Sequence, residues 1–127
     1  MSKPTFVILL AHGSSDIQWL QPFNALEQQV RQQEPALRLA YMELAEPSLE
    51  QVIEEACHQG FREFAVLPLF FAAGRHLRQD VPRQIAAIAQ ERQVEIQLLA
   101  PVGEHPALAD ALLRIVRETL ESSQNAL

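Results

Sequence analysis

The sequence predicts an α/β fold in which a four-stranded parallel sheet lies between two layers of helices. Three observations lead to this prediction. Short apolar runs alternate four times with longer segments whose apolar residues recur at helical spacing. The runs contain few polar residues at alternate positions, which is typical of strands buried on both faces. No linker or shift in composition divides residues 1–127, so we expect a single domain.

The first strand–helix unit occupies residues 5–35. Thr5–Ala11 is nearly all apolar and is predicted to be a buried strand. A helix is predicted within Ile17–Gln33, and Pro35 lies just after it. Proline is tolerated in the first turn of a helix, so Pro22 predicts that regular helix begins near residues 20–22.

The second unit begins with Leu37–Met42, the predicted second strand, and Glu43 follows it directly. Ser48 and Gln51 have the spacing of a capping box, which predicts a helix that starts here and ends near Gly60. The apolar stripe of this helix consists of Leu49, Val52, Ile53, Ala56 and Cys57.

In the third unit, Glu63–Phe71 is the predicted strand, with Pro68 as the point where sheet pairing is expected to fail. Asp80 is the expected N-cap of the next helix, and Pro82 then falls in its first turn. The predicted buried stripe of that helix consists of Val81, Ile85, Ile88 and Ala89.

The fourth unit pairs a predicted strand at Val94–Ala100 with a helix that opens at Pro106. The apolar stripe of this last helix consists of Leu108, Ala109, Leu112, Leu113, Val116 and Leu120. Four strands alternating with four helices require right-handed crossovers, and a flavodoxin-like strand order of 2-1-3-4 is expected.

Composition and charge exclude several classes of protein. The net charge of −6 argues against a nucleic-acid-binding protein. No apolar run reaches the ~18 residues of a membrane span, and the short Met-Ser-Lys-Pro start leaves no room for a signal peptide. Cys57 is the single cysteine, so no internal disulfide forms, and we expect a cytoplasmic protein without a membrane partner.

Several polar residues to which the predicted fold gives no structural role follow the ends of the strands. In a parallel sheet every strand-to-helix loop lies at one edge, and ligands bind where the strand order reverses. In the 2-1-3-4 order this reversal lies between the first and third strands, which deliver His12 and His76. Glu43 ends the second strand at the same edge. The fold therefore predicts that His12, His76 and Glu43 come together.

Two histidines and a carboxylate favour a site for a divalent metal with open coordination positions. Simpler roles stay open for each residue: a turn or cap for His12, a helix entry for His76 and a solvated strand end for Glu43. Ser14 either caps a turn or contributes to an anion site. The basic cluster of Arg75, Arg78 and Arg83 is either a solvated face or part of the same site. Neither phosphate-binding glycine motif is present, and no Gly-x-Ser-x-Gly sequence occurs.

Four motifs in order along the chain resemble the small, single-domain sirohydrochlorin chelatases. The motifs are Ala11-His12-Gly13-Ser14, Glu46-Pro47-Ser48-Leu49, Pro68 through Pro82, and Gly103-Glu104-His105-Pro106. Gly-x-His-x-x-x-Asp-Val-Pro, within the third motif, is the most specific of them. Proteins of this family resemble one half of the larger two-domain cobalt chelatases and ferrochelatases. Ser15 departs from the pattern, because many relatives have arginine there.

The resemblance implies ATP-independent insertion of a divalent metal into sirohydrochlorin, in cobalamin or sirohaem synthesis. It implies that His12 and His76 bind the metal and accept protons, with Glu43 as the catalytic carboxylate beside them. Co²⁺, Fe²⁺ and Ni²⁺ all suit these ligands as the metal substrate, and no organic cofactor is expected. Ser14, Arg75, Arg78 and Phe71 are the residues expected to contact the tetrapyrrole, a flat polycarboxylate.

Two further expectations concern assembly and the alternative to catalysis. A tetrapyrrole is wide compared with the rim of one four-stranded domain, so we expect a homodimer with a symmetric interface.

The same histidines would also serve a non-catalytic carrier of metal or tetrapyrrole. The sequence does not separate this carrier from the chelatase, because both require the same ligands; turnover separates them.

Overall fold

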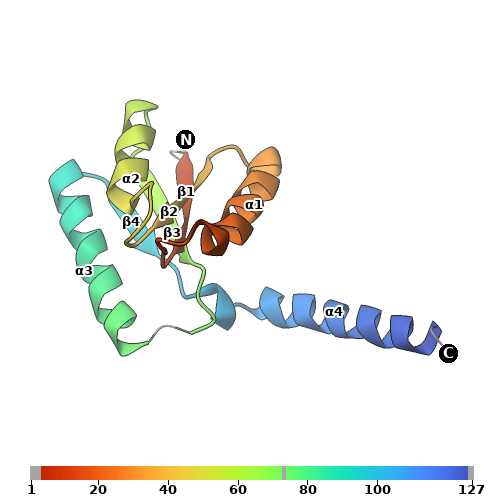
Figure 1. Cartoon of the computed structure of the whole chain (residues 1–127). Helices are drawn as coiled ribbons and strands as arrows, with labels where there is room; N and C mark the ends of the chain where they lie inside the picture. Colours follow the sequence, from red (N-terminus) through yellow and green to blue (C-terminus); the bar gives the residue numbers. More distant parts are fainter. Residues whose placement is uncertain (1–3, 73, 126–127) are drawn as a thin grey trace.

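A computed structural model describes residues 4–72 and 74–125 and shows an α/β fold built on one parallel sheet (Figure 1). The elements are β1 (Thr5–Ala11), α1 (Ile17–Gln33), β2 (Leu37–Tyr41), α2 (Leu49–His58), β3 (Glu63–Pro68), α3 (Arg75–Arg92), β4 (Glu95–Leu98), the 3-10 turn η1 (Val102–Glu104) and α4 (Pro106–Asn125).

The strand order is β2-β1-β3-β4, and every pair of neighbours is parallel. The predicted fold class and strand order are therefore confirmed. β1 is central: Leu9 lies opposite Leu39 of β2 and opposite Leu67 of β3. The reversal of strand order consequently falls between β1 and β3, as the sequence predicted.

The two faces of the sheet are covered unequally. Even-numbered residues of β1 and β3, such as Ile8 and Val66, pack against α2 and α3 in the larger core cluster. Odd-numbered residues of β1 and β2, such as Leu9 and Leu39, form a smaller cluster with α1. The second helix begins as predicted, because Ser48 and Gln51 form the expected capping box.

Two predicted helix starts are wrong. α1 begins at Ile17, with Asp16 as its N-cap, so Pro22 lies inside the helix. α3 begins at Arg75 with Gly74 as its N-cap, and Asp80 is a residue of the helix rather than its cap. Pro82 likewise lies inside α3. Each proline removes one hydrogen bond to the residue four positions earlier, and these early turns are exposed, so water can satisfy the freed carbonyl groups.

Both later strands are shorter than predicted. β3 ends at Pro68 rather than Phe71, and β4 covers Glu95–Leu98 rather than residues 94–100. Proline has no N–H to donate to the ladder, which explains why the strand ends there.

Within the described ranges, no helix is both long and apolar enough to cross a membrane.

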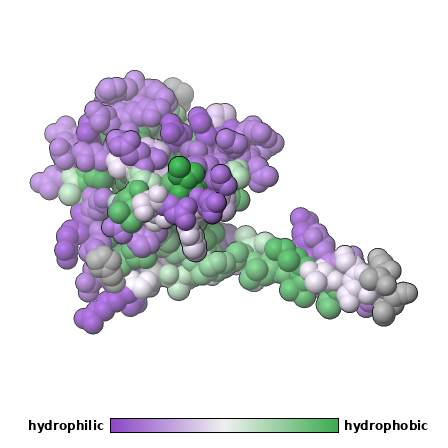
Figure 2. All heavy atoms as spheres, viewed as in Figure 1, coloured by the Kyte–Doolittle hydropathy of each residue, from purple (hydrophilic) through white to green (hydrophobic). Residues whose placement is uncertain are grey.

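The last helix stands apart from the rest of the fold. α4 projects away from the sheet and its other helices (Figure 1), and its main packing neighbour is η1. The apolar stripe predicted for this helix is consequently exposed, and apolar side chains gather along α4 in the space-filling view (Figure 2). Its exposed large residues are Leu112, Leu113, Ile115, Val116 and Leu120.

Candidate functional site

The loops that follow β1 and β2 lie side by side at the carboxyl edge of the sheet. The N–H of Met42 donates to the carbonyl of Ala11 at 2.9 Å, and the N–H of Glu43 donates to the carbonyl of His12 at 3.2 Å. Backbone pairing between the strands thus continues past their ends. This extension places the side chains of His12 and Glu43 at the same level of the edge.

Gly13 allows the two loops to approach this closely. Its φ of +104° lies in the left-handed region, and a Cβ atom built on it would lie 1.8 Å from the carbonyl oxygen of Glu43. Any other residue at position 13 would therefore push the loop of His12 away from that of Glu43.

The side chains of His12 and Glu43 are in direct contact. Nε2 of His12 lies 2.9 Å from Oε1 of Glu43, and the two side chains are 57% and 58% exposed. An ionised carboxylate can only accept hydrogen bonds, so Nε2 of His12 carries the proton when it binds Glu43. In a neutral imidazole, Nδ1 then holds the free lone pair.

His76 is the second residue of α3, and this helix begins directly after the loop that leaves β3. Its backbone thus lies just beyond the strand beside β1, but inside the first turn of α3, whereas the sequence pattern placed it in the loop ahead of the helix. The side chain of His76 lies outside the part of the chain that the structure describes. Its contact with His12 and Glu43 therefore stays a prediction.

Three cavities lie in a row along this edge of the sheet. The central one, of about 350 Å³, is lined by His12, Met42, Glu43, Leu77, Asp80, Arg83, Gln84 and Ala87. A cavity of about 390 Å³ shares Leu77 with it and is mainly apolar, lined by Pro68, Phe70, Arg78, Val81, Pro82 and Leu98–Pro101. A third, of about 210 Å³, shares His12 with the central cavity and is lined by Gly13, Ser14, Trp19, Leu20 and Phe23.

The predicted substrate-contacting residues are distributed unevenly over these cavities. Arg78 lines the apolar cavity and Ser14 the third cavity, where its hydroxyl also accepts a hydrogen bond from the N–H of Asp16 at 3.0 Å. Phe71 and Arg75 are exposed and line none of the three. The turn role left open for Ser14 is thus observed.

Sequence reasoning missed two polar residues of the central cavity, Asp80 and Gln84, as site residues. It assigned Asp80 to a helix cap, and that assignment moved the predicted start of α3 past the site. With α3 starting at Arg75, residues 77, 80 and 84 fall at helical spacing on one side of the helix. A helix that continues through Pro82, with residues 77, 80 and 84 on one side, would have identified both residues.

The loop after β4 is fixed to the loop after β3. The N–H of Gly103 donates to the carbonyl of Phe70 at 2.9 Å, and a Cβ atom at Gly103 would collide with the backbone of Phe71. Nδ1 of His105 accepts a hydrogen bond from the N–H of Ala107 at 3.0 Å and so caps α4. His105 therefore has a structural role at the start of this helix.

Among the described side chains, no group of three or more His, Cys, Asp or Glu residues has the geometry of a metal site. Of the three predicted metal donors, the structure describes the side chains of two, His12 and Glu43. This pair lines a cavity that is also lined by Asp80 and Arg83.

The fold and the site together define a class: α/β proteins with a doubly wound parallel sheet and a ligand site at its carboxyl edge. The chain belongs to the CbiX family, whose sequence profile matches residues 6–119. The predicted family resemblance is thereby confirmed.

Several relatives match over nearly their full length. The sirohydrochlorin cobaltochelatase of Sulfurisphaera tokodaii is 29% identical over 117 residues, which cover 92% of this chain and 95% of the relative. That of Saccharolobus solfataricus is 26% identical over 120 residues, which cover 89% and 94%.

Solved structures show the same fold. The putative cobalamin (vitamin B12) biosynthesis CbiX protein of Marinobacter aquaeolei VT8 superposes with a TM-score of 0.90 at 45% identity, covering 96% of this chain and 99% of that one. The sirohydrochlorin chelatase SirB of Bacillus subtilis subspecies spizizenii, in complex with cobalt, gives a TM-score of 0.77 at 24% identity. This chain spans 51% of the SirB chain, and the likeness concerns the fold.

Proposed function

We propose that this protein inserts a divalent metal ion into sirohydrochlorin without ATP. The names of the relatives support this activity, since those with nearly full-length matches are sirohydrochlorin cobaltochelatases. The observation that carries the proposal is the pair of His12 and Glu43, 2.9 Å apart and facing an open cavity.

Insertion has three chemical requirements. Water must leave the metal ion, two pyrrole nitrogens must lose their protons, and the ion must be presented to one face of the ring. Imidazole binds a divalent metal reversibly and also accepts protons near neutral pH. A neighbouring carboxylate stabilises the imidazolium that forms, so His12 and Glu43 together can receive a pyrrole proton.

The same pair can hold the incoming metal. Two ligand atoms in adjacent positions of an octahedral ion, each ~2.1 Å from the metal, lie about 3.0 Å apart. The observed 2.9 Å separation of Nε2 and Oε1 is compatible with this arrangement in the other tautomer of the neutral imidazole, in which Nδ1 carries the proton and Nε2 has the free lone pair. We infer that His76 supplies the second histidine ligand from the start of α3. Co²⁺ is the metal named in the relatives, and Fe²⁺ and Ni²⁺ suit the same donors.

The tetrapyrrole is proposed to lie across the row of cavities. Its carboxylates would bind Arg78 and, in the central cavity, Arg83, because guanidinium groups bind carboxylates in bidentate geometry. Ser14, Arg75 and Phe71 remain proposed contacts around the rim. A macrocycle is wider than one such cavity, so we propose that the working unit is a homodimer.

Anaerobic absorption spectroscopy tests the activity directly. Sirohydrochlorin and Co²⁺ are mixed with a catalytic amount of protein, and metal insertion is followed against the spontaneous rate. Multiple turnovers are expected, and the variants His12→Ala and His76→Ala should lose them. His58→Ala is the matched control, because His58 is an exposed histidine at the end of α2, away from the carboxyl edge.

The outcome separates two functions. Tight binding of Co²⁺ or of the tetrapyrrole with no turnover above the spontaneous rate would establish a carrier and overturn the chelatase. Turnover that survives in both histidine variants would leave the activity standing and overturn the assignment of the site.

A further inference from the structure

We propose that Trp19 contacts the ring of the bound tetrapyrrole, and that the cavity beside it, on the α1 side of His12, takes one edge of the macrocycle. The inference rests on the proposed function, because it concerns how the same site holds its substrate. It assigns the uncharged ring system to α1 and leaves the carboxylates of the substrate to the arginines of α3. Trp19 then binds the substrate and takes no part in metal binding or proton transfer.

His12 borders two cavities of different chemistry. On its α3 side lies the central cavity of about 350 Å³, which is also lined by charged side chains. On its α1 side lies the cavity of about 210 Å³, where the lining is mainly apolar and consists of Trp19, Leu20 and Phe23 beside the loop of His12. Because both cavities share His12, a flat ligand centred on this residue would extend over both.

The α1-side cavity is too small to hold a whole ligand. Ligand sites usually enclose ~300–1,000 Å³, whereas this cavity has about 210 Å³. Since it shares His12 with the central cavity, it forms one part of a larger site. It therefore suits one edge of a molecule whose centre lies at His12.

The α1 side offers contacts to an uncharged surface. Between His12 and Phe23 the chain contains no lysine or arginine, and Asp16 is its one acidic residue. Oδ1 of Asp16 accepts a hydrogen bond from the N–H of Gln18 at 2.9 Å and so caps the helix. A carboxylate of the substrate would meet no cation from this segment, whereas the flat face of a macrocycle packs favourably against aromatic side chains.

The position of Trp19 is set by the start of α1. The N–H of Asp16 donates to the hydroxyl oxygen of Ser14 at 3.0 Å, and the N–H of Trp19 donates to the carbonyl of Asp16 at 3.0 Å. These two bonds connect the first turn of α1 to the loop that begins at His12. The indole is thereby held beside the imidazole by local backbone structure.

Trp19 is exposed although its neighbours on α1 are packed. Leu20 and Phe23 pack against the smaller core cluster, which anchors this end of the helix. Trp19 itself is 68% exposed. Tryptophan supplies a large and rigid contact area at a low cost in conformational entropy, and ligand sites combine such apolar surface with a few polar groups that fix orientation. Trp19 and His12 match these two roles.

Equilibrium binding of metal-free sirohydrochlorin, followed by its absorption, tests the contact without turnover. Trp19→Ala should raise the Kd by at least ~10-fold. Trp19→Phe keeps an aromatic ring and should stay within about 3-fold of the unmodified protein. Ile17→Ala is the matched control, because Ile17 is 70% exposed in the same turn and lines none of the three cavities. An unchanged Kd in Trp19→Ala would overturn the inference.

Salt separates a ring contact from a charge contact. The effect of Trp19→Ala should be the same at ~0.1 M and at ~1 M ionic strength, because ring packing involves no net charge. The effect of Arg83→Gln, which removes a proposed partner of a carboxylate, should shrink at the higher salt concentration. A Trp19→Ala effect that disappears with salt would contradict a ring contact.

Steady-state kinetics and sedimentation complete the test. Trp19→Ala should raise the KM for sirohydrochlorin and leave kcat and the KM for Co²⁺ little changed. A fall in kcat alone, or a change of mass in sedimentation, would mean that the side chain acts on the reaction or on assembly, and would overturn the direct contact. If the unmodified protein binds sirohydrochlorin through Trp19 but shows no turnover, the inference stands and the chelatase function fails.

Discussion

The Nε2 atom of His12 lies 2.9 Å from Oε1 of Glu43, although 31 positions separate the two residues. Each residue follows the end of a strand, and β1 and β2 are parallel neighbours. Their backbones remain hydrogen-bonded beyond the strands, through Ala11 with Met42 and through His12 with Glu43. The pair is therefore positioned by the backbone pairing of the two strands.

If His12 and Glu43 act as we propose, Glu43→Gln should slow metal insertion by at least ~10-fold, the lower end of the effect of changing a group that supports a metal ligand. Glutamine keeps the shape of the side chain but loses the negative charge that stabilises a protonated His12. Steady-state kinetics should show the loss in kcat, with KM for sirohydrochlorin little changed.

Glu34→Gln makes the same chemical change on an exposed residue that caps the end of α1. It should keep the rate of the unmodified protein. If Glu43→Gln also keeps that rate, Glu43 has no part in the reaction.

Gly13→Ala should disrupt the site through the backbone. The added Cβ would lie 1.8 Å from the carbonyl oxygen of Glu43, and φ at this position is +104°. We expect a loss of unfolding free energy above the ~1–3 kcal/mol typical of strained backbone alone, together with loss of activity. Urea denaturation and the insertion assay measure the two effects.

Gly60→Ala is the matched control for this change. Its φ of +101° imposes a similar strain, but no heavy atom lies within 4 Å of the added Cβ. It should lower the unfolding free energy by only the ~1–3 kcal/mol of strained backbone alone and leave activity unchanged. Equal stability losses in the two variants would show that the contact with Glu43 has no energetic effect.

Much of the fold could be predicted because buried strands and helix caps have recognisable sequence patterns. The apolar run of Thr5–Ala11 and the capping box at Ser48 each had a single reading, and both predictions agree with the structure. The common edge for His12 and Glu43 followed from the parallel sheet alone. Their 2.9 Å separation did not, because it depends on the positive φ of Gly13.

The errors fall where local propensity and tertiary context disagree. Asp80 and Pro82 resemble a helix start, but the helix already runs from Arg75. Local signals predicted the last helix correctly but not its position, because an apolar stripe shows that a helix is amphipathic and not where it lies. The exposure of Val116 is a property of the arrangement of α4, which the periodicity of the sequence does not encode.

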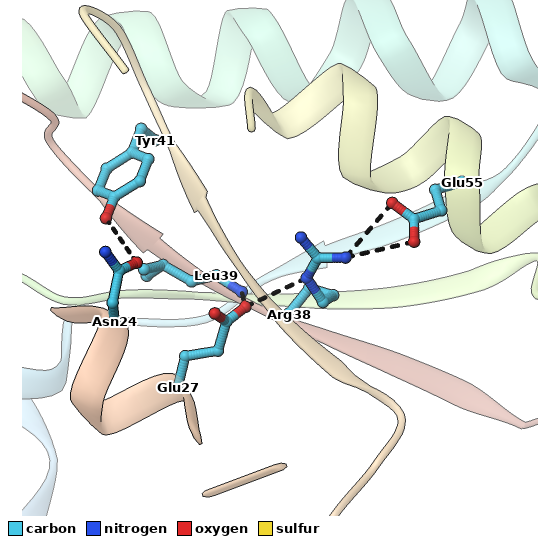
Figure 3. Close-up of polar contacts among 6 residues, drawn as sticks. All are labelled: Asn24, Glu27, Arg38, Leu39, Tyr41 and Glu55. Carbon is cyan, nitrogen blue, oxygen red and sulfur yellow. Dashed lines mark hydrogen bonds and ion pairs between the residues drawn. The ribbon is translucent and has the colours of Figure 1, made fainter. Parts of the chain in front are cut away.

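Glu27→Ala should destabilise the edge strand. Oε2 of Glu27 accepts hydrogen bonds from the N–H of Leu39 at 2.6 Å and from Nε of Arg38 at 3.2 Å (Figure 3). Its side chain is only 16% exposed, so the alanine variant leaves both donors partly buried without this acceptor. We expect a loss of about 1–3 kcal/mol in unfolding free energy, measured by urea denaturation.

Glu55→Ala removes the other carboxylate that binds Arg38, at 3.2 Å from Nη1. Glu55 is 55% exposed, so its pair should contribute no more than ~1 kcal/mol. If Glu55→Ala lowers the unfolding free energy as much as Glu27→Ala does, the hydrogen bond from the N–H of Leu39 to Glu27 is not what stabilises β2.

Tyr41 should make stability fall at high pH. Burial, and secondly the negative charge of Glu27, raise the pKa of the phenol above its ordinary value of 10.0. The folded state therefore holds this proton more tightly than the unfolded state does. The resulting stabilisation is complete below the unfolded pKa and is lost as pH rises through the folded pKa. Unfolding free energy should decline above pH ~10, and Tyr41→Phe should reduce that decline.

A direct titration checks the cause, because Tyr41 is the single tyrosine of the chain. Phenolate absorbance should appear at higher pH in the folded protein than in the urea-unfolded protein. In Glu27→Ala the difference should shrink without vanishing, since burial contributes more to the raised pKa than Glu27 does. Phenolate forming at the same pH in both states would mean that the hydroxyl group, which donates to Asn24 at 3.1 Å, is accessible to water.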